Sequence, residues 1–164
     1  KGAINDYEKA ITLNPKNPAA YFNRGNIKKD EYKDYKGAID DYSKTILIDP
    51  LYKKVYNSRG SAKLSLKDFK GAIDDFNTAI QNDPGDSNAY LKRGIAKGGI
   101  NKFKDAIIDM NKCIDLDPGN SEAYLFRGGC KAEIGDSASG CSDIKKSHSL
   151  GNTRASSFIK EICD

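Results

Sequence analysis

Two patterns of apolar positions alternate along the whole chain. The first begins with a small residue followed by Ile, and an aromatic residue or Met comes three positions after that Ile. A second small or polar residue, again followed by Ile, comes three positions later. Copies of this pattern begin at Ala3, Ala38, Ala72 and Ala106. Apolar residues at i, i+1, i+4, i+7 and i+8 form one stripe along an α-helix. Each copy therefore predicts a helix with one buried face.

The second pattern is a Tyr followed four positions later by a Gly. It occurs at Tyr21, Tyr56, Tyr90 and Tyr124, a step of 34 residues with one step of 35. Because the two patterns alternate, each repeat is predicted to be a pair of antiparallel helices. A pair this short cannot bury its own apolar stripe, so neighbouring pairs must stack into a continuous core.

Residues that end and begin helices keep the same step. Pro15, Pro50, Pro84 and Pro118 follow the first pattern, and Pro cannot continue a helix. The side-chain oxygens after them are expected to cap the next helix; they belong to Asn17, Asp86-Ser87 and Asn120-Ser121. The glycines of the second pattern, at positions 25, 60, 94 and 128, are expected to face Ala38, Ala72 and Ala106, so that two helix backbones can approach closely.

These features together resemble the tetratricopeptide repeat family over essentially the whole chain: the period of 34, the aromatic-x-x-x-Gly block, the Ala-x-x-x-aromatic-x-x-Ala block and the terminal Pro. The resemblance implies an all-α, right-handed superhelical solenoid of antiparallel helix pairs, with about four full repeats, an N-terminal half repeat and a C-terminal capping helix. The family's Trp is Tyr here, and its Leu three residues later is Arg, a variant common in the family.

We expect a single domain over residues 1–164. Its predicted parts are the second helix of a truncated repeat (1–16), repeats at 17–52, 53–86, 87–120 and 121–150, and a capping helix at 151–164. Lys1-Gly2-Ala3 matches Lys36-Gly37-Ala38, so the sequence opens halfway through a repeat and we expect the natural protein to extend upstream. The tail, with Gly-Cys-x-Asp and Leu-Gly, resembles that of bacterial members of the family, which leaves cytoplasm and periplasm equally open.

Composition narrows the class of protein. Of the 164 residues, 38% are hydrophobic and 30% are charged, and the net charge of +4 is mild. No segment reaches the roughly 18 apolar residues of a membrane span. Basic and acidic residues are interspersed rather than grouped, which argues against a nucleic-acid-binding tail. We therefore expect neither a membrane span nor a nucleic-acid partner.

The arginines follow the repeat, and so do a set of aspartates. The expected charge ladder between adjacent helices consists of Arg24, Arg59, Arg93 and Arg127 with Asp6, Asp41, Asp75 and Asp109, and Asp143 continues the series. Opposite charges that keep the repeat phase favour a structural role over a nucleic-acid surface. The segment Gly98-Gly99 lacks the spacing of a phosphate-binding loop. It is expected to loosen the last turn of a helix, and a deliberately widened groove is the alternative.

The cysteines suggest one covalent link. Cys141 and His148 lie seven residues apart on one helical face, which is expected to point at the capping helix that carries Cys163. A Cys141–Cys163 disulfide, closing a loop of about 22 residues, would stabilise the cap by roughly 3 kcal/mol. Reduced, partly buried thiols are the alternative, and the spacing matches no known zinc site. Cys113 and Cys130 fall at small core positions.

No catalytic group can be assembled from these residues, because the single His lies at a core position and the Ser residues lack an elbow motif. We therefore predict a protein that is not an enzyme and uses no cofactor or metal.

The resemblance implies instead that a partner peptide or helix binds along a concave wall of first helices. The positions expected to line it are Phe22, Asn26, Lys29, Asn57, Ser61, Leu64, Leu91, Lys92, Ile95 and Leu125. For Leu91, Ile95 and Leu125 the alternative is that they are ordinary first-helix residues covered by their neighbours.

Chaperone-binding members of the family clamp a C-terminal carboxylate with Lys, Asn and Arg. Here Asn26 and Lys92 match, but Phe22, Ser58 and Asn88 replace the Lys, Asn and Lys of the clamp, so a chaperone tail is disfavoured. The function predicted is a protein-interaction module. The alternative is a scaffold that self-assembles through the exposed stripe of Ile4, Tyr7 and Ile11.

Overall fold

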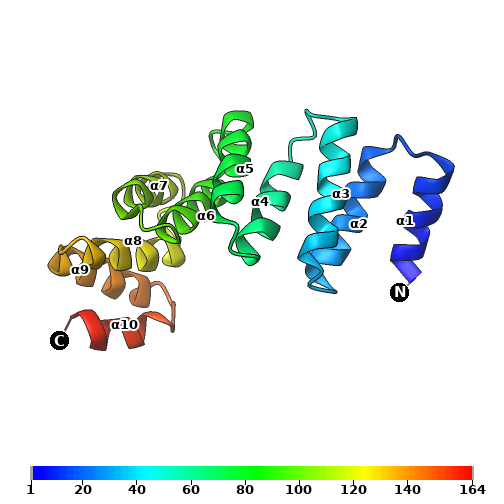
Figure 1. Cartoon of the computed structure of the whole chain (residues 1–164). Coiled ribbons are helices and arrows are strands. Elements are labelled where there is room, and N and C mark those ends of the chain that lie inside the picture. Colours follow the sequence, from blue (N-terminus) through cyan, green and yellow to red (C-terminus); the bar gives the residue numbers. More distant parts are fainter. Residues whose placement is uncertain (1, 164) are drawn as a thin grey trace. The chain divides into compact units, whose positions relative to one another are not determined.

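The computed structural model describes residues 2–163, which form ten α-helices and no strand (Figure 1). The helices are α1 (Gly2–Leu13), α2 (Pro18–Asp30), α3 (Tyr35–Ile48), α4 (Val55–Ser65), α5 (Phe69–Asn82), α6 (Ser87–Gly98), α7 (Phe103–Leu116), α8 (Ser121–Glu133), α9 (Ser137–Ser149) and α10 (Ala155–Ile162). The all-α prediction is confirmed. The final helix begins at Ala155, four residues after the start of the segment 151–164 predicted for it.

Helix ends follow the capping residues. Asn17 accepts hydrogen bonds from the backbone N–H groups of Ala19 and Ala20 at 3.1 and 3.3 Å. Asp86 and Asn120 cap α6 and α8 in the same way. Because these side chains satisfy N–H groups that have no partner inside the helix, α2, α6 and α8 begin at defined residues, whereas Lys54 before α4 makes no side-chain cap.

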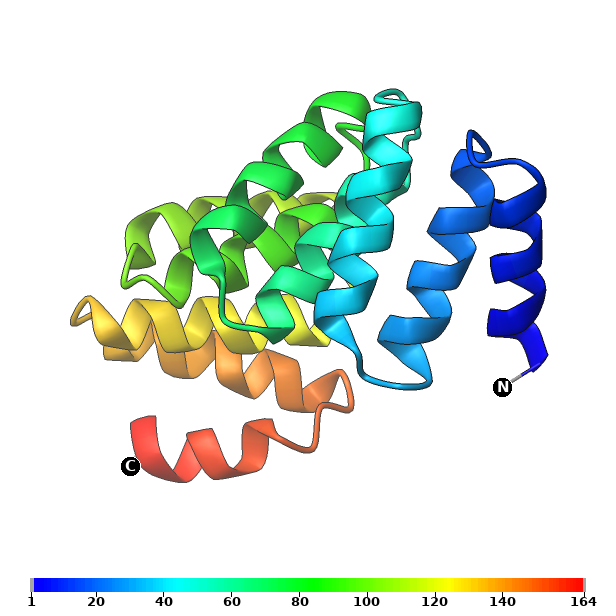
Figure 2. The same cartoon turned by 45° about the vertical axis from the view of Figure 1, so that its right-hand side comes forward.

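The chain divides into two compact units at the loop between α5 and α6, the first ending at Asn82 and the second beginning at Asp83. In the first unit α2 packs on α3, α3 on α4, and α4 on α5, while α1 packs on α2. In the second unit α6 packs on α7, α7 on α8, and α8 on α9, and α10 covers α9 (Figure 2). Each unit is thus a series of consecutive helix pairs.

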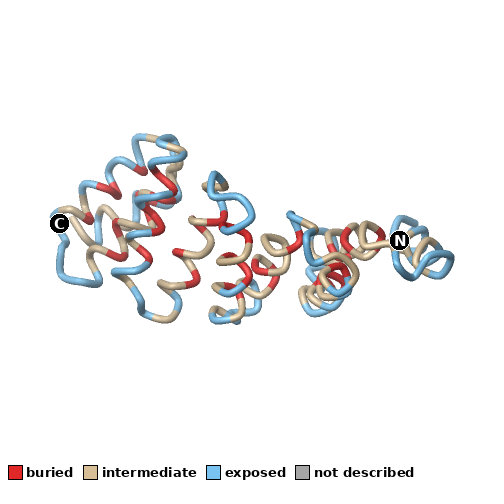
Figure 3. Tube along the Cα trace, turned by 90° about the horizontal axis from the view of Figure 1, so that it is seen from above, coloured by how far each residue is buried: buried red, intermediate tan, exposed pale blue. Residues whose placement is uncertain are grey.

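Each unit has its own core. In the first, Tyr42, Ala38 and Val55 have no exposed surface. In the second, Met110 is fully buried between α6 and α7, and Ile144 and Ala155 form the core beneath α10. The buried positions recur along successive helices (Figure 3), as the apolar stripe predicts.

The glycines of the first helices permit close packing, and the atoms nearest to them belong mostly to residues other than the predicted alanines. A Cβ atom on Gly25 would lie 2.8 Å from the ring of Tyr42, and one on Gly128 would lie 2.7 Å from the carbonyl oxygen of Gly140. For Gly94 the three nearest atoms include the carbonyl oxygen of Ala106, at 3.3 Å. The aromatic residue of the stripe, which is larger than Ala, reaches the opposite helix first.

His148 does not lie at a core position as predicted. It is exposed in the last turn of α9, whereas the neighbouring Ser147 is buried and donates a hydrogen bond to the carbonyl of Ser121 at 2.7 Å. An imidazole buried without a hydrogen-bond partner would lose its solvation. The Ser hydroxyl has a carbonyl within reach and so occupies the buried place.

Candidate functional site

The predicted groove residues separate into two groups. Phe22, Leu91 and Leu125 are only 8%, 5% and 4% exposed, and each belongs to a core cluster. A partner cannot reach these three side chains, so for Leu91 and Leu125 the structure favours the alternative in which neighbouring helices cover them. The other seven are partly exposed and remain candidates: Asn26, Lys29, Asn57, Ser61, Leu64, Lys92 and Ile95.

In the first unit the candidates come from α2 and α4, which contact each other. Asn26 and Lys29 are three residues apart on α2, and Ser61 and Leu64 are three apart on α4, so each pair lies on one face of its helix. Tyr42 donates a hydrogen bond to Oδ1 of Asn26 at 2.8 Å, which fixes the amide. Burial raises the pKa of Tyr42 well above its usual value, so this hydroxyl stays a donor.

In the second unit the candidates are Lys92 and Ile95 on α6. Helix α6 ends at Gly98, and Gly99 follows it with helical φ. Gly98 and Gly99 lie three and four residues after Ile95, on the same face of the helix, and leave little side-chain surface beside it.

Four buried carboxylates form the most regular charged feature. Each accepts two hydrogen bonds from the Arg of its own repeat and a third contact from a Lys four residues after that Arg. At Asp109 the distances are 2.6 Å and 3.0 Å to Arg93 and 2.8 Å to Lys97. The other groups are Arg24–Asp41–Lys28, Arg59–Asp75–Lys63 and Arg127–Asp143–Lys131. We call these the Arg–Asp–Lys groups.

The lysines were not predicted from the sequence, although they recur with the same step as the arginines. Asp6 was predicted to belong to the ladder, but it is exposed on α1. A repeating Arg-Gly-x-x-Lys motif was the signal that could have revealed the complete group.

The guanidinium groups make further contacts that explain the Tyr-x-x-Arg-Gly sequence. The Cζ atoms of Arg24, Arg93 and Arg127 lie 5.7, 5.4 and 5.3 Å from the ring centres of the Tyr three residues earlier. A cation over an aromatic face is attracted to it. Arg127 also donates to Asn111 of the preceding repeat at 2.8 Å, and Arg59 to Ser43 at 3.1 Å. Arg59 and Arg127 thus each join the second helix of their own repeat to that of the preceding repeat.

The electrostatics of these groups stabilise the charged forms. Hydrogen bonding to Asp41 raises the pKa of Arg24, even though burial opposes the shift. Burial alone would raise the pKa of Asp143, but hydrogen bonds from Arg127 and Lys131, together with their charges, hold it below its usual value. The pair of Arg127 and Asp143 therefore remains ionised at neutral pH.

The sulfur atoms of Cys141 and Cys163 form a disulfide that joins α9 to the end of α10, with Cα atoms 5.2 Å apart. Cys113 and Cys130 are free and buried. Burial raises the pKa of Cys113 to about 11 and also raises that of Cys130. A thiol with so little thiolate at neutral pH is a poor nucleophile.

Over residues 2–163, no cluster of three or more His, Cys, Asp or Glu side chains is placed to hold a metal ion. None of the helices in this range combines the length and the apolar content that crossing a bilayer requires.

Comparison with known proteins places these features in a family. A model described as TPR repeat matches residues 1–30, and the tetratricopeptide repeat model matches residues 53–86 and 87–120, which together exceed half of the chain. No curated protein matches the sequence.

Several solved structures are similar. MamA (41-end) from Desulfovibrio magneticus RS-1 has 21% identity and a TM-score of 0.85 over 90% of this chain and 82% of its own. Another crystal structure of MamA has 25% identity and a TM-score of 0.86 over 94% and 84%. The first TPR of Spaghetti (RPAP3), bound to the HSP90 peptide SRMEEVD, has 29% identity and a TM-score of 0.69 over 72% and 93%.

Proposed function

Because the chain belongs to the tetratricopeptide repeat family, we propose that it is a non-catalytic protein-interaction module that binds a peptide or helix of a partner protein on its first helices. The likeness to a domain bound to a peptide supports this proposal most directly. The match to that domain covers 72% of this chain, and its bound peptide supports a peptide as the ligand of this chain.

The surface available for such a ligand is the set of partly exposed side chains on the first helices. In the first unit, Asn26 and Lys29 on α2 and Ser61 and Leu64 on α4 supply polar contacts around one apolar side chain. An amide held in place by Tyr42 loses little freedom on binding a peptide backbone. The expected ligand is an extended segment held by polar contacts, with one apolar anchor.

The ligand is not expected to be the acidic tail that the Spaghetti domain binds. Phe22 is buried where chaperone-binding members carry a Lys, and Ser58 and Asn88 replace two further clamp residues. A carboxylate placed there would lack the charge-assisted hydrogen bonds that stabilise it. The peptide SRMEEVD is therefore a suitable negative control.

Selection of peptides from a random displayed library, followed by calorimetric titration, tests the proposal. Leu64→Glu in the first unit and Ile95→Glu in the second are the test variants, and Lys70→Glu, an exposed change on α5, is the matched control. A selected peptide should bind the wild type and the control equally and a test variant at least about tenfold more weakly. Equal binding to all variants would place the site elsewhere.

Self-assembly is the second candidate function, and one observation favours it. Helix α1 has no buried residue, whereas every other helix of the first unit that is described has at least three. Light scattering on the purified chain tests this candidate, since a monomer at micromolar concentration would oppose it.

A further inference from the structure

Two apolar side chains are highly exposed on the surface of the first unit. Leu47 in the last turn of α3 is 74% exposed, and Leu51 in the segment between α3 and α4 is 81% exposed. Single exposed apolar residues are common in folded proteins, but these two lie four residues apart and among cations. Helix α3 packs on both α2 and α4, so the surroundings of Leu47 do not depend on where the sequence begins.

Leu47 forms part of the wall of an open hollow of about 700 Å³ on α2 and α3. Tyr21 lies in the same wall, and three cations and two carboxylates line the rest, so the hollow has a positive excess. The charged residues are Arg24, Lys28, Lys44, Asp40 and Asp41. Arg24 and Lys28 are bound to Asp41, whereas Lys44 is exposed and forms no ion pair within residues 2–163.

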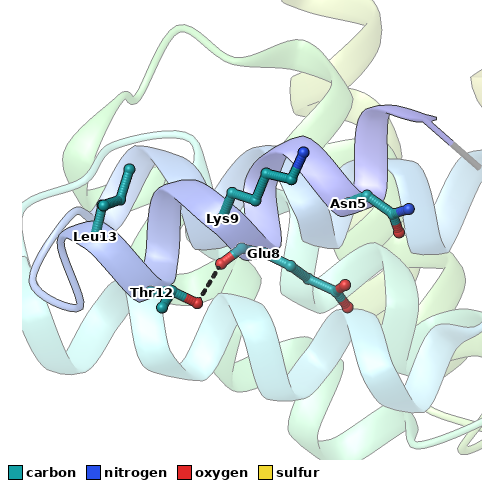
Figure 4. A pocket seen from close by; sticks show the side chains of 5 residues that line it. All are labelled: Asn5, Glu8, Lys9, Thr12 and Leu13. Carbon is teal, nitrogen blue, oxygen red and sulfur yellow. Dashed lines mark hydrogen bonds between the residues drawn. The ribbon is translucent and has the colours of Figure 1, made fainter.

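The hollow on α1 in Figure 4 shows the same repeat positions without the positive excess. It is lined by Asn5, Glu8, Lys9, Thr12 and Leu13. Thr12 stands where α3 has Leu47, and its hydroxyl donates a hydrogen bond to the carbonyl of Glu8 at 2.8 Å. The charges of Glu8 and Lys9 cancel. The hollow on α2 and α3 therefore differs in its charge and in the apolar residue at this position.

The segment that follows α3 departs from the capping rule of the repeat. An Asn or Asp caps the first helix of the other full repeats, whereas Lys53 and Lys54 precede α4, which has no side-chain cap. A cation there is also unfavourable, because the helix dipole is positive at this end. Asp49, the one carboxylate of residues 48–54, accepts a hydrogen bond from the backbone N–H of Leu51 at 3.0 Å. Residues that break a local rule without a structural gain are expected at functional sites.

We propose that Leu47, Leu51, Lys44, Lys53 and Lys54 form a second binding surface, which takes an acidic segment of a partner protein with at least one large apolar side chain. The apolar side chain packs on Leu47 and enters the hollow, and the carboxylates bind the lysines. Charge complementarity identifies the occupant, because all three lysines are exposed and none forms an ion pair with a described residue. This surface lies outside the first helices, so it goes beyond the proposed function.

Two other occupants fit less well. A bilayer of anionic lipids would attract the lysines, but it has no side chain to enter the hollow beside Leu47. A second copy of the chain would offer its acidic turns, Asp83-Pro84-Gly85-Asp86 and Asp117-Pro118-Gly119-Asn120, which hold no large apolar residue. The aspartates of these turns already accept hydrogen bonds from backbone N–H groups of their own turns.

Peptide selection with matched variants tests the proposal. Random peptides displayed on phage are selected on the wild type, after those that bind the double variant Lys44→Glu/Leu47→Ser have been removed. Synthetic copies of the selected peptides are then titrated calorimetrically against each single variant. Lys112→Glu and Ile108→Ser are the controls, because Lys112 has the repeat position of Lys44 and Ile108 is a 64% exposed apolar residue of α7. Circular dichroism verifies that every variant stays helical.

The selected peptides should combine Asp or Glu with Leu, Ile or Phe. They should bind Lys44→Glu and Leu47→Ser at least about tenfold more weakly than they bind the wild type and the two controls. Added salt should weaken binding, because exposed charges are screened. Failure to select any peptide, selection of peptides without acidic residues, or equal binding to test and control variants overturns the proposal.

Two further measurements separate the other occupants. Vesicles of phosphatidylserine and phosphatidylcholine should not retain the chain on sedimentation, and light scattering should give one mass for the wild type and Leu47→Ser. Vesicle binding that is lost in Lys53→Glu/Lys54→Glu, or a dimer that is lost in Leu47→Ser, overturns the proposal. Leu64→Glu on α4 should leave the affinity of the selected peptides unchanged, so failure of this surface is distinguishable from failure of the site on the first helices.

Discussion

Replacing Asp143 by Asn tests the energetic role assigned to the Arg–Asp–Lys groups. Asp143 is 6% exposed and accepts hydrogen bonds from Arg127 at 2.6 and 2.8 Å, and Lys131 lies 2.8 Å from it. The amide of Asn has nearly the same shape as the carboxylate, so packing is preserved. What changes is the charge that compensates two cations.

The magnitude follows from the environment of those cations. Removing one partner of a buried ion pair costs about 3–5 kcal/mol. The side chains of Arg127 and Lys131 are 17% and 21% exposed, so water can partly replace the lost carboxylate. Arg127 also keeps its hydrogen bond to Asn111. We therefore expect the lower end of the range, about 3 kcal/mol.

Hydrogen exchange of peptides from α8 and α9 measures this loss locally, without assuming that the two units unfold together. A loss of about 3 kcal/mol corresponds to exchange faster by roughly 100-fold. Asp6→Asn is the control: it changes the same repeat position where it is exposed, and it should alter stability by less than about 0.5 kcal/mol. An effect of Asp143→Asn no larger than that of the control would refute the reasoning.

The pH dependence has a definite sign. Because the folded chain lowers the pKa of Asp143, its contribution to stability is complete above the unfolded value of about 3.9. The contribution is lost as the pH falls through the lower, folded value. The difference between wild type and Asp143→Asn should thus be constant near neutrality and should shrink below about pH 4. A difference that grew on acidification would contradict the assigned shift.

Three further predictions concern packing, backbone and the disulfide. Gly128→Ala should destabilise the second unit by about 1–3 kcal/mol, because its Cβ would meet the Gly140 carbonyl and Ile144. Gly129→Ala, with nothing within 4 Å, should stabilise α8 by up to about 1 kcal/mol. Thermal unfolding checks this, because the melting temperature should fall in the first variant and rise in the second. Lys67→Gly should stabilise by on the order of 0.5–1 kcal/mol, since Lys67 has a φ of 60°, and an unchanged or lower melting temperature would contradict this. Cys163→Ser should weaken the docking of α10 by roughly 3 kcal/mol, visible as faster exchange in α10 alone, and the wild type under reductant should behave alike.

The helices are predictable from the sequence because the same pattern recurs, so that an atypical residue in one copy does not hide the period. One stripe of Ala, Ile and an aromatic residue appears four times, so its period cannot be accidental, and each cap recurs beside a Pro. The atoms nearest to the glycines of the first helices could not be predicted, for a geometric reason. A period places Gly25 and Tyr42 on facing stripes, but it does not say whether the ring or Ala38 comes nearer.

The candidate site is less predictable from sequence. Phe22 and Leu91 occupy positions that face outward on an isolated first helix, and only the packing of the second helix decides that they are buried. Likewise, Lys33 and Lys67 adopt positive φ at a turn where Gly135 occupies the same repeat position in the second unit. A lysine in the sequence does not indicate a positive φ. The short turn that connects the two helices of a pair imposes this conformation.

The Arg–Asp–Lys groups also determine where the positive charge of the chain resides. Each group joins two cations to one anion, so the four groups carry +4 between them, equal to the formal net charge of the whole sequence. The remaining acidic and basic residues therefore cancel. The basic isoelectric point therefore comes from the Arg–Asp–Lys groups between the helices. An array lengthened by this repeat would gain about one positive charge per repeat, while the net charge of its other residues stayed close to zero.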